Sequence, residues 1–148
     1  NVPLATVESL YNRFEFLNLI SNQGADIIQP DICVCGGLLE MKKINAIAEA
    51  HYVSIAPHNP MGPLATAVNL HHFILDGAIW KLEFILPTES DWGDWVDEPY
   101  LPKDGYLELR PDRPGWGIEI NEEAFTDDEY CHWERSSPYR PDGSTGYI

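Results

Sequence analysis

The fold is decided by a stretch that joins a short apolar strand to a stiff turn: Tyr52-Val53-Ser54-Ile55-Ala56-Pro57-His58-Asn59-Pro60-Met61-Gly62-Pro63. Prolines at three positions fix the backbone φ angle in the turn, and a helix-like segment begins directly after it. His58 is thereby placed where a buried strand ends. In parallel α/β folds the carboxyl ends of the strands are where ligands bind and where chemistry is done.

The same strand–helix unit recurs along the first part of the chain. Short apolar strands are predicted over 2–6, 26–29, 52–56 and 79–84, and helices over 12–20, 38–50 and 64–73. Successive strands are about 25 residues apart, which is typical of barrel-type βαβ repeats. The sequence therefore predicts an α/β fold with a parallel sheet. A further short strand is predicted over 105–109, with 117–120 as a candidate partner.

Composition excludes several classes of protein. A hydrophobic fraction of 44% excludes a disordered chain, and a formal net charge of −15 argues against a nucleic-acid partner. No apolar run reaches the roughly 20 residues that cross a membrane. Cys33, Cys35 and Cys131 are too few for a disulfide scaffold, and the spacing of the first two does not suit zinc. We expect reduced thiols and a cytoplasmic location.

An ionisable residue stands at the end of each predicted strand: Glu8, Asp31, His58 and Glu83. Taken singly, each has an ordinary explanation, such as a helix cap, a turn residue or a structural histidine. A carboxylate inside the apolar run around Glu83 is the hardest to explain in this way, because burying it unpaired is costly. If the four strands are parallel neighbours, the four side chains converge on one end of the sheet.

These four residue types together suit proton abstraction next to a carboxylate. Asp31 can hydrogen-bond His58 and fix its tautomer, so that the histidine acts as a base. Glu8 is an oxygen ligand suited to Mg²⁺, which stabilises the enediolate formed on proton loss. A protonated Glu83 can donate a hydrogen bond to the same developing charge.

Four motifs in the chain resemble the enolase superfamily. The similarity is to the mandelate racemase-like subgroup, and within it to sugar-acid dehydratases of the galactonate and gluconate type. It covers about the first 125 residues, in the order and spacing of these motifs: Pro3-Leu4-Ala5-Thr6-Val7-Glu8, Asp26-Ile27-Ile28-Gln29-Pro30-Asp31 with Gly36-Gly37, Ala56-Pro57-His58-Asn59-Pro60-Met61-Gly62-Pro63, and Gly115-Trp116-Gly117-Ile118-Glu119-Ile120-Asn121-Glu122.

The resemblance implies the C-terminal part of a modified TIM-type (β/α) barrel, with about its last four strands and an irregular C-terminal extension. Residues 1–87 would form this half of the barrel. Residues 88–125 would be a loop and short-strand segment that packs on the barrel and on a capping domain. Residues 126–148 lie outside the resemblance, and the polar, Pro- and Gly-rich composition of the chain's end predicts a mobile tail there.

The resemblance also assigns roles to the strand-end residues. His58 and Asp31 would form the catalytic dyad, Glu83 would face the enediolate, and Glu8 would be the third of three acidic Mg²⁺ ligands. The substrate would be a small sugar acid. Loss of the proton on C2 and then of the 3-hydroxyl would give a 2-keto-3-deoxy acid.

The sequence departs from the family in two respects. It opens within the fifth barrel strand, so we expect the chain to be inactive without the N-terminal half of the enzyme, and the full-length form to be a homo-oligomer. Val7 also stands where the family usually has glycine. Two alternatives remain open: a racemase or epimerase that uses the same dyad, and a catalytically dead binding or assembly module.

Overall fold

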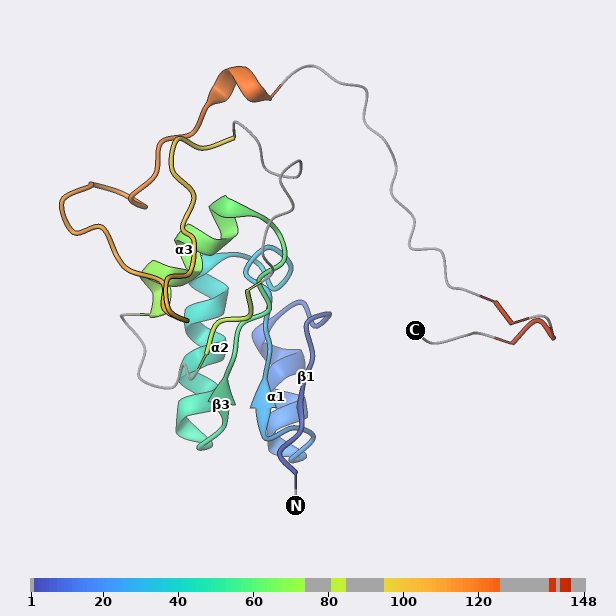
Figure 1. Ribbon diagram of the computed structural model, residues 1–148. Helices are drawn as coiled ribbons and strands as arrows, with labels where there is room; N and C mark the ends of the chain where they lie inside the picture. The colour runs from blue at the N-terminus through green and yellow to red at the C-terminus, as the bar shows by residue number, and fades with distance from the viewer. Residues whose placement is uncertain (1, 74–80, 85–94, 126–138, 141, 145–148) are drawn as a thin grey trace.

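Three strand–helix units follow one another in a computed structural model that describes residues 2–73, 81–84, 95–125, 139–140 and 142–144 (Figure 1). The elements are β1 (Ala5–Thr6), α1 (Arg13–Ser21), β2 (Ile27–Ile28), α2 (Leu38–Ala50), β3 (Ser54–Ile55), α3 (Pro63–Phe73) and the short 3-10 helix η1 (Glu122–Ala124). The order of strands and helices agrees with the sequence prediction, although each strand is shorter than expected. No helix among the described residues is long and apolar enough to cross a membrane.

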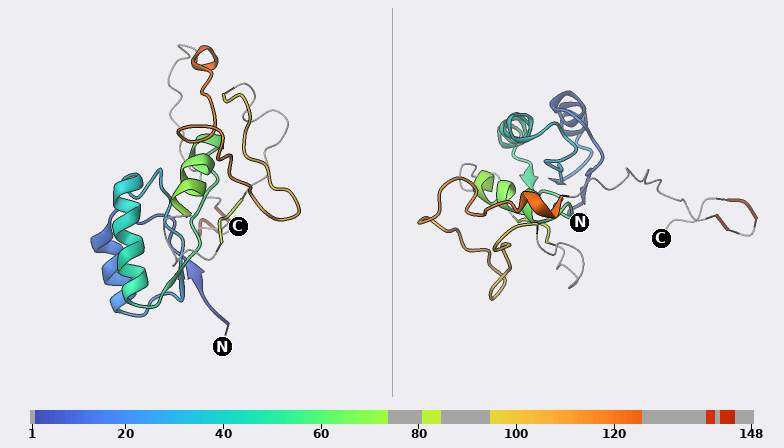
Figure 2. Two further views of the ribbon diagram at one scale, coloured as in Figure 1. Left: turned by 90° about the vertical axis from the view of Figure 1, so that its left-hand side faces the viewer. Right: turned by 90° about the horizontal axis from the view of Figure 1, so that it is seen from above.

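The three strands form a parallel sheet in the order β1-β2-β3. α1 and α2 lie side by side on one face of this sheet (Figure 2). Ile28 and Ile55 are register partners, and both are fully buried beneath the two helices. An α/β fold with a parallel sheet is therefore confirmed, and it is consistent with part of a TIM-type barrel.

The main core lies between the sheet and the helices. Apolar residues at helical spacing on α1 and α2 meet the strand residues there, because the i, i+3 and i+4 positions of a helix share one face. The buried residues of this core are Phe16, Ile20, Ala25, Ile28, Ile32, Cys35, Met41, Ile44, Ala48, Ile55 and Ala65.

Polar groups at the helix ends explain where the helices begin and end. The side chain of Asn12 accepts hydrogen bonds from the N–H groups of Phe14 and Glu15 and so caps α1. α3 begins at a proline, whose fixed φ suits the first helical position. At the end of α2, Val53 N–H donates to Ala48 and Tyr52 N–H to Glu49, which is the hydrogen-bond pattern of a Schellman motif.

The Schellman motif after α2 leads to a prediction about stability. Tyr52 occupies its left-handed position with φ 59 although it is not glycine, and its side chain is 98% exposed. We expect Tyr52→Gly to raise the free energy of unfolding by about 0.5–1 kcal/mol, because relief of about 1–2 kcal/mol of backbone strain exceeds the entropy cost of glycine. Urea denaturation measures this change. Tyr52→Ala, which keeps the strain, is the control; equal stability of the two variants would contradict the argument.

Two strand predictions need correction. A fourth strand was expected over 79–84. Residues 79–80 lie outside the described residues, and residues 81–84 form no strand. Glu83 N–H nevertheless donates to Pro57 O at 3.1 Å. The predicted strand over 105–109 is wrong, since only Tyr106 makes a bridge, to Lys103. Ile120 pairs with Val96 instead of with that segment. The bridge between Lys103 and Tyr106 closes a four-residue turn, which is too short to contain a pair of strands. Most of the segment 126–148 lies outside the described residues, so its mobility stays a prediction.

The segment 95–125 lies beside α3 (Figures 1 and 2). Tyr100 is buried against Ala67 and Leu70 of α3 in a second, smaller core. The ring of His71 also meets the ring of Trp116 edge-on, with a centroid distance of 5.5 Å. The segment 95–125 is thus held on α3 by aromatic and apolar contacts.

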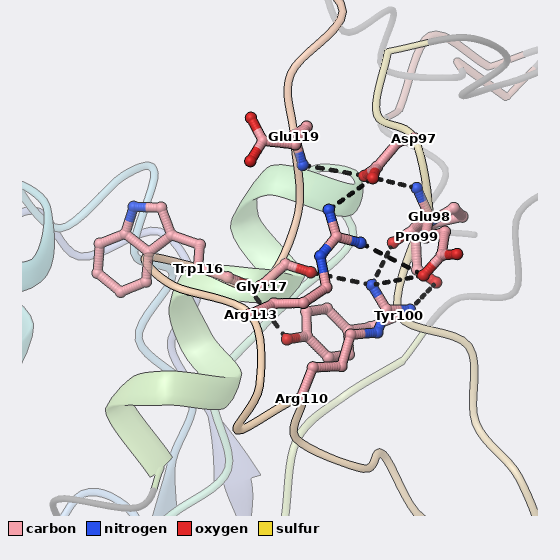
Figure 3. Close-up of polar contacts among 9 residues, drawn as sticks. All are labelled: Asp97, Glu98, Pro99, Tyr100, Arg110, Arg113, Trp116, Gly117 and Glu119. Atoms are coloured by element: carbon pink, nitrogen blue, oxygen red, sulfur yellow. Dashed lines mark hydrogen bonds and ion pairs between the residues drawn. The ribbon is translucent and has the colours of Figure 1, made fainter.

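Two arginines hold this segment in shape (Figure 3). The guanidinium group of Arg110 lies over the ring of Tyr100 at 4.4 Å from its centroid, and it donates to the carbonyl oxygens of Glu98, Pro99 and Gly117. Arg113 pairs with Asp97 at 2.6 Å. Asp97 Oδ1 also accepts the N–H groups of Glu98 and Glu119. These contacts tie residues 97–100 to residues 110–119.

The hydrogen bonds to Asp97 predict how this cluster responds to acid. The N–H of Glu119 and then the guanidinium of Arg113 lower the pKa of Asp97 from 3.8 to about 2. Since the pKa is lowered in the folded state, the stabilisation is present above about pH 4 and is lost as pH falls through 2. We expect the amide proton shifts of Glu98 and Glu119 to titrate together with a midpoint near pH 2. The Asp97→Asn variant, as control, should show no such titration, and a wild-type midpoint near 3.8 would contradict the prediction.

Candidate active site

The backbone places His58 and Asp31 next to each other beyond the ends of β2 and β3. Ala56 N–H donates to Ile28 O at 2.9 Å and His58 N–H donates to Pro30 O at 3.2 Å. Asp31 and His58 form a parallel bridge that continues the sheet pairing. The two residues are therefore neighbours because the ladder between their strands extends past the regular strands.

Asp31 and His58 are also joined through their side chains. His58 Nδ1 lies 2.8 Å from Asp31 Oδ2, and Asp31 Oδ1 accepts the N–H of Cys33 at 2.7 Å. The Asp31 side chain is 1% exposed, whereas that of His58 is 21% exposed. A buried carboxylate accepts a hydrogen bond from Nδ1–H, which leaves the lone pair on Nε2 free. The pair thus has the geometry of an oriented general base.

Glu83 approaches His58 from the other side. Its backbone N–H is bound to Pro57 O, so the segment 81–84 is anchored next to the histidine. Glu83 Oε2 lies 3.9 Å from His58 Nε2, which is beyond hydrogen-bond distance. This oxygen is buried and has no hydrogen-bond partner among the described residues. His58 Nε2 and a carboxyl oxygen therefore face the same space.

Glu8 does not join the other three residues. It is half-buried after β1 and makes no hydrogen bond or ion pair with any described residue. No group of three or more His, Cys, Asp and Glu side chains that could hold a metal ion occurs within the described ranges. Val7, which directly precedes Glu8, has φ 85, in the region that favours glycine. The structure thus brings together three of the four strand-end residues.

A network of buried polar side chains holds the loop that follows His58, and the sequence did not predict it. Asn59, Thr66 and Asn69 form a buried network of hydrogen bonds directly after His58. A signal for it was present in the sequence: Thr66 and Asn69 are polar residues three positions apart within the otherwise apolar run 64–70, and they therefore lie on one face.

The cysteines beside Asp31 are poor nucleophiles. Cys33 is exposed at the surface, but part of its side chain is buried. That partial burial, and then the negative charge of Asp31, raise the pKa of the Cys33 thiol. The same causes raise the pKa of the buried Cys35 thiol from 9.0 to about 11. Neither is suited to attack a substrate near neutral pH.

These thiol pKa values predict slow alkylation. In a Cys131→Ser background at pH 8, Cys35 should hold about 100-fold less thiolate than an ordinary exposed cysteine, since each pKa unit above the pH changes that fraction tenfold. Cys33 should react more slowly than a model peptide, but faster than Cys35. Iodoacetamide labelling followed by peptide mass analysis measures both rates, and labelling of Cys35 as fast as the peptide would refute the prediction.

The fold and the site define a parallel α/β chain with an Asp–His pair at its strand ends. A family model described as Enolase C-terminal domain-like matches residues 1–124, so the chain belongs to that family. The resemblance to the enolase superfamily and its mandelate racemase-like subgroup is thereby confirmed.

Named relatives carry the comparison further. A D-galactonate dehydratase of Xanthomonas campestris pv. campestris (strain B100) is 38% identical over 130 residues, which are 84% of this chain and 34% of the relative. An enolase of Agrobacterium radiobacter, provisionally named a galactarate dehydratase and solved with bound Na and L-malate, is 53% identical with a TM-score of 0.90. It covers 100% of this chain, which spans 41% of that protein.

A third comparison is with a Burkholderia SAR-1 protein provisionally named a mandelate racemase/muconate lactonizing enzyme. It is 35% identical with a TM-score of 0.75, over 84% of this chain and 30% of its own. The chain therefore spans well under half the length of each of these three proteins.

Proposed function

We propose that this chain is the C-terminal part of a sugar-acid dehydratase, a carbon–oxygen lyase of the enolase superfamily. The observation that carries the proposal is the hydrogen bond of 2.8 Å between Asp31 and His58 at the strand ends. Support comes from the similarity to a D-galactonate dehydratase and to a protein provisionally named a galactarate dehydratase. The substrate would be a galactonate- or gluconate-like acid.

His58 would remove the proton on the carbon next to the substrate carboxylate. Nε2 is the atom that can do so, because Nδ1 is occupied by Asp31. When Nε2 takes the proton, the imidazole becomes a cation, and the adjacent buried carboxylate stabilises it. The bond between C2 and hydrogen breaks, and its electron pair forms the enediolate. The 3-hydroxyl then takes a proton from a general acid elsewhere in the enzyme, its bond to C3 breaks and it leaves as water, which gives an enol that becomes the 2-keto-3-deoxy acid.

Glu83 would act on the negative charge that this step creates. Its buried Oε2 faces the same space as His58 Nε2 and has no other hydrogen-bond partner among the described residues. A protonated carboxyl group there can donate to an enediolate oxygen, where a preorganised donor gives more stabilisation than it gives a neutral substrate.

Mg²⁺ is the proposed cofactor, with Glu8 as one ligand. The described residues do not by themselves fit a complete Mg²⁺ site, because they offer one carboxylate where the ion takes about six oxygen ligands. The steps above therefore depend only on His58, Asp31 and Glu83. That the remaining ligands lie on a further part of the enzyme, and that this chain alone is inactive, stay predictions.

The dehydratase proposal is tested by product analysis. The chain, supplied with the N-terminal part of the enzyme, is incubated with Mg²⁺ and with a set of aldonic and aldaric acids, and formation of 2-keto-3-deoxy acids is followed by mass spectrometry. One of these acids should lose one water. Inversion at C2 without loss of water would indicate a racemase or epimerase, and no change in any acid together with no Mg²⁺ binding would indicate a binding module.

A further inference from the structure

We infer that Thr66 is a positioning residue for His58, acting through the loop between the histidine and α3. The inference deepens the proposed function and rests on it, because it concerns what holds the proposed base in place. No contact between Thr66 and His58 is involved. The hydroxyl of Thr66 instead fixes both ends of the loop that follows the histidine.

The start of this loop is bound to Thr66 through Asn59, the residue directly after His58. Asn59 Nδ2 donates to Thr66 Oγ1 at 2.9 Å, and Asn59 Oδ1 accepts from Asn69 Nδ2 at 2.9 Å. Both polar atoms of the Asn59 amide are therefore occupied, and the amide cannot rotate without losing both partners. Thr66 and Asn69 lie three residues apart on α3 and so present both partners from one face.

The end of the loop is bound to the same hydroxyl. Thr66 Oγ1 donates to Gly62 O at 3.0 Å, and Thr66 N–H donates to the same carbonyl at 3.1 Å. Gly62 has φ 99, a conformation that favours glycine, and this lets the chain turn into α3. The hydroxyl thus accepts from the first residue of the loop and donates to the last.

Burial makes this network specific. Asn59 and Thr66 are each 1% exposed and Asn69 is 0% exposed, so water cannot replace a lost partner. If the hydroxyl is removed, Asn59 Nδ2 is left without an acceptor and the loop must rearrange to satisfy it. Because Asn59 is covalently joined to His58, that rearrangement displaces the imidazole from Asp31.

The test compares Thr66→Val, which keeps the shape and removes the hydroxyl, with Thr66→Ser, which keeps the hydroxyl. The readout is the ¹H–¹⁵N signal of the His58 Nδ1–H in the 148-residue chain, whose protection from exchange reports the hydrogen bond to Asp31 without any need for turnover. Asn45→Leu is the matched control. It removes another fully buried amide, one that bonds His72 at the far end of α3.

The inference predicts that Thr66→Val loses the protected Nδ1–H signal, whereas Thr66→Ser and Asn45→Leu retain it. Retention in Thr66→Val would overturn the inference and leave the proposed base intact. Loss of the signal in Asn45→Leu as well would also overturn the inference, because removal of any buried amide would then be enough to disturb His58. A wild-type spectrum without the signal would contradict both the hydrogen bond between His58 and Asp31 and the role of Thr66 in holding it. Should Thr66→Val not fold, Thr66→Ala, which also removes the hydroxyl, takes its place under the same criteria.

Discussion

Replacing His58 by asparagine should lower the rate of C2 proton abstraction by about 10²–10⁴-fold, the range that a positioned general base contributes. Asparagine can still donate to Asp31 in place of Nδ1, but it has no basic nitrogen at the position of Nε2. The fold should therefore be retained while the chemistry is lost. Incorporation of solvent deuterium at C2, measured by NMR on a preparation with dehydratase activity, gives the rate.

His51→Asn is the matched control for this variant. His51 follows α2 and is exposed, and its side chain makes no hydrogen bond or ion pair with Asp31, His58 or Glu83. This control should exchange as fast as the wild type. If His58→Asn also retained the wild-type rate, His58 would not be the base.

The second large effect is expected for Asp31→Asn. Asp31 accepts two hydrogen bonds, from His58 Nδ1 and from the N–H of Cys33. An amide has one acceptor oxygen, so one of these two donors must face an NH₂ group. Either the histidine takes the wrong tautomer or the turn at Cys33 opens. We expect a loss of activity on the order of 10⁴-fold, as for the corresponding change in serine proteases.

The same conflict should lower stability. A buried donor left without a partner costs about 1–3 kcal/mol, so the free energy of unfolding of Asp31→Asn should fall by that amount. Asp26→Asn is the matched control, because Asp26 is exposed and accepts one side-chain hydrogen bond, from Leu4 N–H, which an amide oxygen can replace. Equal effects of the two substitutions on activity would contradict the role given to Asp31.

The repeating part of the fold could be predicted from the sequence because local patterns specify it. The range Leu38–Ala50 was predicted for α2 and is observed, since apolar residues recur at helical spacing and Gly37 precedes them. The Asp31–His58 contact could also be anticipated, because parallel strands bring their carboxyl ends to one edge.

Other features could not be predicted because they depend on contacts distant in sequence. The pairing of Val96 with Ile120 depends on Asp97, Arg113 and Glu119 meeting across some twenty residues. The segment 105–109 forms no strand: Leu107 packs against the smaller core on α3, whereas Tyr106 and Leu109 are exposed. The left-handed conformation of Val7 was likewise not predicted from its residue type, which disfavours it.

The central claim is that the Asp31–His58 pair removes the proton next to a sugar-acid carboxylate. It is tested most directly with a 3-deoxy analogue of whichever acid the protein dehydrates, because this analogue has no hydroxyl to lose. In D₂O with Mg²⁺, the account predicts that the wild type exchanges the C2 hydrogen of the analogue for deuterium and that His58→Asn does not. A wild-type protein that dehydrates the parent acid but never exchanges C2 of the analogue, or a His58→Asn variant that exchanges it at the wild-type rate, would contradict the account.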